Sequence, residues 1–119
     1  MPRILVVDDE PDMRFLIRLY LEKAGHQVVE AGHGAAALES VHEALPDLVV
    51  TDVMMPVMGG LELIERLRSD PATATIPILV VSGDSELAEG ADTALEKPFA
   101  PDRLVEAASA LLSSRSAVS

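Results

Sequence analysis

Residues 3–10 read RILVVDDE, an apolar run that ends abruptly in three acids. Apolar runs without polar alternation are typical of strands that are buried on both faces, as in a parallel sheet. We therefore predict a first strand at 4–7, followed directly by a cluster of carboxylates. Further strand candidates follow at 27–30, 47–50, 78–81 and 93–96.

Amphipathic helical patterns separate these strand candidates. The clearest covers 13–24, where apolar residues keep one face over three turns and stop at Gly25. Alternating strands and helices predict an α/β fold, a doubly wound sandwich that binds ligands at the carboxyl ends of its strands. We expect one domain over 1–119, with a core of about 3–112 and a frayed tail at 113–119. The other helical patterns cover 37–45, 63–67 and 101–112.

Composition narrows the function classes. The chain is 49% hydrophobic and 24% charged, as ordinary globular proteins are, and its apolar runs are too short to span a membrane. A formal charge of −11 disfavours direct binding to nucleic acid or to anionic membrane surfaces. The chain has no cysteine, which fits a cytoplasmic location.

Chemically active side chains follow four of the five predicted strands. Asp8 and Asp9 follow the first strand, Asp52 the third, Ser82 the fourth and Lys97 the fifth. In such a sheet these ends share one edge, so three carboxylates, a hydroxyl and an ammonium should meet there. Oxygen ligands without histidine or cysteine suit Mg²⁺. A carboxylate beside a metal and a lysine can attack a phosphoryl group, which predicts aspartyl phosphorylation.

Each of these residues also has a simpler explanation. The acids at 8–12 could cap the following helix, Asp52 could open a turn and Ser82 could cap the next segment. These roles do not explain why three acids should crowd beside a lysine, since like charges in contact are costly without a cation. The three histidines, at 26, 33 and 42, lack metal-ligand spacing and are expected at the surface.

Five motifs together resemble those of the receiver domains of two-component response regulators. They appear in the family's order and span about 3–112, nearly the whole chain. The resemblance implies a flavodoxin-like five-stranded parallel sheet with strand order 2-1-3-4-5. The motifs are VVDDE at 6–10, VTDVMMP at 50–56, SG at 82–83, GAD at 90–92 and KPF at 97–99.

The resemblance also implies roles for the site residues. Asp52 would accept the phosphoryl group, Ser82 would hydrogen-bond it, and Lys97 would pair with it and precede a cis Pro98. A histidine kinase or a phosphotransfer protein would donate the group, and the output would be a changed contact with another protein. The implied Mg²⁺ ligands are Asp9, Asp52, the backbone carbonyl of Met54 and, through a water molecule, Asp8.

The chain departs from the family pattern in three places. Ala94 replaces an aromatic switch residue, and Gly59 replaces an acidic or amide residue. Only the seven residues 83–89 are left for the fourth helix, which allows about two turns at most. We therefore expect phosphorylation to order 83–90 rather than to turn a side chain.

Two other functions are also compatible with these residues. A haloacid-dehalogenase-like phosphatase also uses an aspartate nucleophile and Mg²⁺, but such enzymes usually carry a second acid two residues later, where this chain has Met54. A phosphorylation-independent binding module is the other alternative, and the intact acids, Ser82 and Lys97 argue against it.

Overall fold

The five predicted strands form one parallel sheet in the order β2-β1-β3-β4-β5. This computed structural model describes residues 2–53, 58–83 and 90–118, with the backbone alone for 114–118. The observed order confirms the predicted flavodoxin-like sheet. The strands are β1 (Arg3–Val7), β2 (Gln27–Ala31), β3 (Leu48–Asp52), β4 (Ile78–Ser82) and β5 (Thr93–Glu96).

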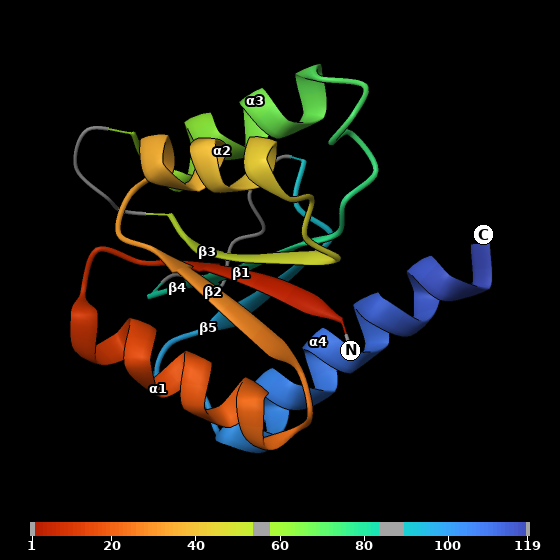
Figure 1. The fold of residues 1–119 in the computed structure, drawn as a ribbon. Coiled ribbons are helices and arrows are strands. Elements are labelled where there is room, and N and C mark those ends of the chain that lie inside the picture. Colours follow the sequence, from red (N-terminus) through yellow and green to blue (C-terminus); the bar gives the residue numbers. More distant parts are fainter. Residues whose placement is uncertain (1, 54–57, 84–89, 119) are drawn as a thin grey trace.

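Helices cover both faces of the sheet. In Figure 1, α2 and α3 lie above the strands, whereas α1 and α4 lie below them. Because successive side chains of a strand point to opposite faces, each buried strand contributes to two cores. Leu5 and Val7 pack toward α2 and α3, while Ile4 and Val6 pack toward α1 and α4. The helices are α1 (Pro11–Lys23), α2 (Gly34–Glu43), α3 (Gly60–Ser69) and α4 (Pro101–Val118).

The end of α4 differs from the prediction. The sequence pattern ended this helix at Leu112 and assigned 113–119 to a frayed tail, but the helix continues to Val118. These residues contain neither glycine nor proline, and each residue added to an existing helix gains a hydrogen bond without a new nucleation step. The predicted tail is therefore wrong for the residues up to Val118.

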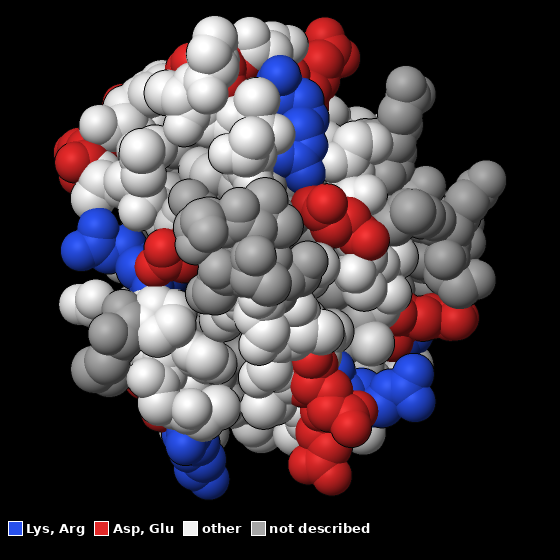
Figure 2. All heavy atoms as spheres, turned by 90° about the vertical axis from the view of Figure 1, so that its right-hand side faces the viewer, with Lys and Arg blue, Asp and Glu red and all other residues white. Residues whose placement is uncertain are grey.

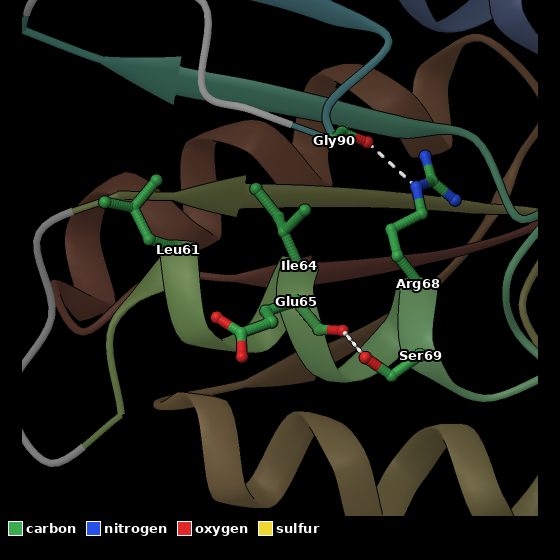
Figure 3. A pocket seen from close by; sticks show the side chains of 6 residues that line it. All are labelled: Leu61, Ile64, Glu65, Arg68, Ser69 and Gly90. Atoms are coloured by element: carbon green, nitrogen blue, oxygen red, sulfur yellow. Dashed lines mark hydrogen bonds between the residues drawn. The ribbon is translucent and has the colours of Figure 1, made fainter.

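Arg68 of α3 binds the residues just before β5. Its guanidinium donates to the carbonyl of Gly90 at 2.8 Å and to the carboxylate of Asp92 at 2.8 Å, and Asp92 also accepts from the backbone N of Ile78. Figure 3 shows the hydrogen bond from Arg68 to Gly90. Both residues line a hollow of about 610 Å³. Asp92 of the GAD motif thus anchors the start of β5. The predicted short helix at 83–89 falls mostly on residues 84–89, which lie outside the described residues.

The surface carries both signs of charge. Acidic and basic side chains are interspersed on the face shown in Figure 2, and the chain as a whole has a formal charge of −11. Within the described residues, no helix has both the length and the apolar character that crossing a membrane requires.

Candidate functional site

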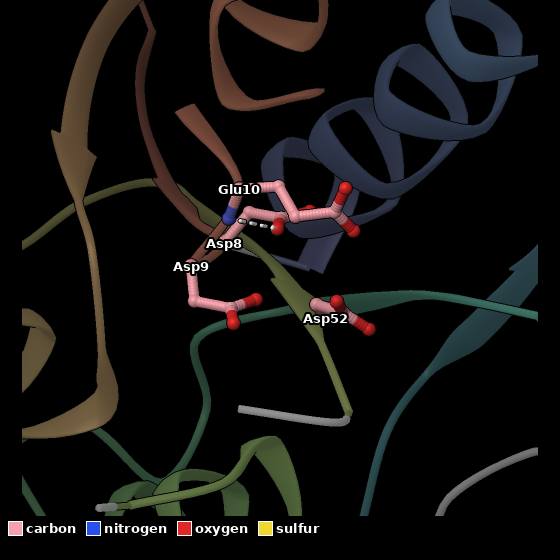
Figure 4. A group of neighbouring side chains, drawn as sticks. All are labelled: Asp8, Asp9, Glu10 and Asp52. Carbon is pink, nitrogen blue, oxygen red and sulfur yellow. Dashed lines mark hydrogen bonds between the residues drawn. The ribbon is translucent and has the colours of Figure 1, made fainter. Parts of the chain in front are cut away.

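The acidic edge lies where β1 and β3 end. Asp8 directly follows β1, and Asp52 is the last residue of the neighbouring β3. Figure 4 shows the carboxylates of Asp8, Asp9 and Asp52 on this edge, together with Glu10. The sheet therefore brings together acids that are more than 40 residues apart in the chain, as the strand pattern predicted.

Lys97 links the two buried acids. Its Nζ lies 3.4 Å from Oδ2 of Asp8 and 3.3 Å from Oδ2 of Asp52. Asp8 is 1% exposed and Asp52 is 7% exposed, so both carboxylates are largely removed from water. Buried carboxylates are costly unless they are paired, and the lysine partly offsets that cost. Ser82, 8% exposed, ends β4 next to β3 on the same edge.

Burial and charge act on the pKa of both partners. Burial raises the pKa of Asp8 above its ordinary value, although the hydrogen bond from the backbone N of Glu10 and the charge of Lys97 oppose this shift. For Lys97, burial lowers the pKa, but attraction to Asp8 and Asp52 outweighs it and the net shift is upward. The lysine therefore stays charged at neutral pH, beside a carboxyl whose ionised form is disfavoured.

The acids are close enough to share one cation. Oxygen atoms of Asp8, Asp9, Glu10 and Asp52 lie within 4.8 Å of one another. A set of carboxylate oxygens without nitrogen or sulfur ligands fits Mg²⁺, which binds one or two carboxylates and otherwise keeps water or phosphate oxygens. The predicted ligand Met54 lies outside the described residues. For Glu10, the sequence suggested only a role as a cap of the following helix. Its side chain makes no capping hydrogen bond and instead belongs to the acidic cluster.

The start of α3 packs directly against the end of β3. The backbone N of Gly60 donates to the carbonyl of Val53 at 3.0 Å, and a Cβ on Gly60 would overlap the carbonyl oxygen of Asp52. Buried Thr51 donates from Oγ1 to that carbonyl oxygen at 2.9 Å. The carbonyl of Asp52 is therefore bonded to Thr51 and lies against Gly60.

Residues 4–109 match the family described as "Response regulator receiver domain". The chain belongs to this family. Receiver domains are regulatory phosphoacceptor modules that histidine kinases phosphorylate, and the acidic cluster of this chain is typical of their Mg²⁺ site. The match favours a receiver domain over the haloacid-dehalogenase-like phosphatase considered from the sequence.

Curated relatives include proteins with different outputs. The chain is 42% identical to the sensor histidine kinase TmoS of Ectopseudomonas mendocina, over 94% of this chain and 12% of that protein. It is 38% identical to the phosphate regulon transcriptional regulatory protein PhoB of Pseudomonas aeruginosa, over 92% of this chain and 51% of that protein. The chain thus spans about half or less of the length of these relatives.

Two solved structures share the fold over nearly their whole length. A putative response regulator from Chloroflexus aurantiacus superposes with a TM-score of 0.90 at 35% identity, covering 94% of this chain and 98% of that one. The chemotaxis protein CheY4 of Vibrio cholerae superposes with a TM-score of 0.88 at 30% identity, covering 93% and 98%.

Among the described residues, the acidic cluster of this receiver domain includes no histidine. His33 and His42 are exposed, as expected, and His33 caps α2 by accepting from the backbone N of Ala36 at 3.2 Å. His26 differs from the prediction, because both ring nitrogens are buried without a hydrogen-bond partner among the described residues. The turn after α1 places its ring in a hollow that Pro2 and the α4 residue Leu112 also line.

Proposed function

We propose that the carboxylate of Asp52 accepts a phosphoryl group in a Mg²⁺-dependent reaction. The observation that carries this proposal is the position of Lys97, whose Nζ lies between the carboxylates of Asp52 and Asp8. An ammonium at this place can neutralise negative charge that phosphorylation adds to Asp52. The clustering of Asp9 with these two acids supports a shared cation site.

The reaction follows from this placement. An oxygen of Asp52 attacks phosphorus, and the bond between phosphorus and the nitrogen of a donor phosphohistidine breaks, so that Asp52 becomes an acyl phosphate. Lys97 pairs with the new phosphoryl oxygens, and the hydroxyl of Ser82 donates a hydrogen bond to one of them. Mg²⁺ held by Asp8, Asp9, Asp52 and the carbonyl of Met54 would supply positive charge to the same oxygens.

A histidine kinase or a histidine phosphotransfer protein is the proposed donor, and a changed contact with another protein is the proposed output. The relatives include a sensor histidine kinase and transcriptional regulators, so they support no single downstream partner. The cytoplasmic location and the division of the chain as one receiver domain over 1–119 stay predictions.

Incubation with Mg²⁺ and a small acyl phosphate, followed by intact mass measurement, tests the proposal. The wild-type chain should gain the mass of one phosphoryl group, and the gain should disappear with a metal chelator and in Asp52→Asn. Adduct formation in Asp52→Asn, or mapping of the group to Asp8 or Asp9, would show that the assignment is wrong. A folded wild-type chain that gains no mass would favour the phosphorylation-independent binding module.

A further inference from the structure

Arg14 of α1 connects the acidic edge to the neighbouring strand β2. Its Nη1 donates to the backbone carbonyl of Asp8 at 2.7 Å, and its Nε donates to Oε1 of Glu30 at 3.0 Å. The side chains of Arg14 and Glu30 are only 22% and 25% exposed. A planar guanidinium fixed at two points holds its partners in a defined geometry, which a flexible ammonium does not reproduce.

The peptide unit between Asp8 and Asp9 is the part of the site that Arg14 restrains. The backbone N of Asp8 donates to the carbonyl of Ala31 at 3.2 Å, while Arg14 binds the carbonyl on the other side. That carbonyl and the N–H of Asp9 belong to one planar peptide unit. Fixing the orientation of the carbonyl therefore also fixes the direction in which the backbone continues to Asp9. Within the described ranges, the carboxylate of Asp9 accepts no hydrogen bond, so no such bond restrains it apart from the position of its backbone.

We propose that Arg14 is a positioning residue for the Mg²⁺ site. It holds the Asp8–Asp9 peptide so that both carboxylates stay within reach of Asp52, and Glu30 acts as the anchor for its guanidinium. This inference rests on the proposed function, because it adds a residue to the same site.

The charge of Arg14 opposes the effect of its position. A guanidinium near the acidic cluster repels a cation, so losing that charge alone would strengthen Mg²⁺ binding. Losing a group that orients metal ligands has the opposite effect and typically weakens metal affinity by about 10–100-fold. The sign of the change in affinity therefore distinguishes positioning from electrostatics.

Arg18 provides a matched control on the same helix. It lies one turn beyond Arg14 and donates from Nη1 to Oε2 of the same Glu30 at 2.6 Å, and from Nε to Glu22 at 3.2 Å. Among the described residues, it makes no hydrogen bond to Asp8. Arg18→Gln therefore removes the same charge and a bond to the same carboxylate, but leaves the restraint on the Asp8–Asp9 peptide in place.

The test is a Mg²⁺ titration of the ¹⁵N-labelled full chain, followed by NMR, with thermal melting of each metal-free variant. We expect Arg14→Gln to raise the Kd for Mg²⁺ by about tenfold or more, and Arg18→Gln to leave it unchanged or lower it. Arg14→Lys should also raise the Kd relative to wild type, because a flexible ammonium does not reproduce the geometry of the guanidinium. The amide resonance of Asp9 should shift in metal-free Arg14→Gln but not in Arg18→Gln.

Each alternative result has a definite meaning. Equal weakening in Arg14→Gln and Arg18→Gln, or an unchanged or lower Kd in Arg14→Gln, overturns this inference while leaving the proposed function intact. A wild-type chain that binds no Mg²⁺ overturns the proposed function, and this inference with it. If Arg14→Gln does not fold, the comparison passes to Arg14→Lys and Arg18→Lys, where equal Kd values overturn the inference.

Discussion

Gly60, the first residue of α3, is a position where one methyl group should damage both stability and function. A Cβ built there overlaps the carbonyl oxygen of Asp52 and lies 2.9 Å from the Cα of Val53. The second distance is about half an ångström short of the 3.4 Å at which ordinary contact begins. Both obstacles are backbone atoms, so no side-chain rotation can relieve the overlap and either β3 or α3 must shift.

The expected cost of Gly60→Ala follows from this geometry. Extra volume in a well-packed interior costs about 1–3 kcal/mol, and a clash with backbone belongs in the upper part of that range. Alanine recovers up to about 1 kcal/mol of helix propensity. We therefore expect a loss of about 2 kcal/mol in the free energy of unfolding, which lowers the Tm by roughly 6–10 °C for a chain of this size.

Urea unfolding and phosphorylation kinetics measure the two effects. Because the clash displaces the backbone of Asp52, the initial rate of phosphorylation by a small acyl phosphate should fall by about tenfold or more. Gly83→Ala is the control for stability, since a Cβ at Gly83 meets nothing within 4 Å. If Gly60→Ala unfolds at the same urea concentration as Gly83→Ala, the packing argument is wrong, and if its rate equals that of wild type, the link to Asp52 is wrong.

Three further predictions concern charged residues. Burial raises the pKa of Asp8, so the ionised carboxylate costs stability above that pKa. In Mg²⁺-free buffer, Asp8→Asn should therefore melt at a higher temperature than wild type at pH 7, and this difference in Tm should vanish as the pH falls toward 3.8. A difference in Tm that stays constant with pH contradicts the reasoning. Hydrogen bonds from Arg18 and Arg14 lower the pKa of Glu30 despite partial burial. Glu30→Gln should therefore melt at a lower temperature than wild type at pH 7, and this difference in Tm should shrink below pH 4.5. A difference in Tm that persists below pH 4.5 refutes the reasoning. Arg68→Met removes four hydrogen bonds and should lower the free energy of unfolding, measured by urea titration, by about 2–3 kcal/mol. A loss under about 1 kcal/mol would mean that these bonds do not stabilise the start of β5.

Most of the fold could be predicted from the sequence because its signals are local. The apolar runs at Ile4 and Ile78 and the helical spacing of apolar residues before Gly25 depend on neighbours within a few positions of the chain. The expected cis bond between Lys97 and Pro98 is also present. The end of α4 could not be predicted in the same way, because no glycine or proline marks it and helices end gradually.

The sequence by itself determined the sheet, its covering helices and the gathering of Asp8, Asp52 and Lys97 at one edge, since parallel strands place their carboxyl ends together. Only the tertiary structure decided how these groups are held. The guanidinium of Arg14 on the Asp8 carbonyl, and the contact of Gly60 with the backbone of Asp52, depend on how whole elements pack and which rotamer each side chain adopts. Periodicity specifies which face a residue occupies, but it does not specify distances between atoms that different elements bring into contact.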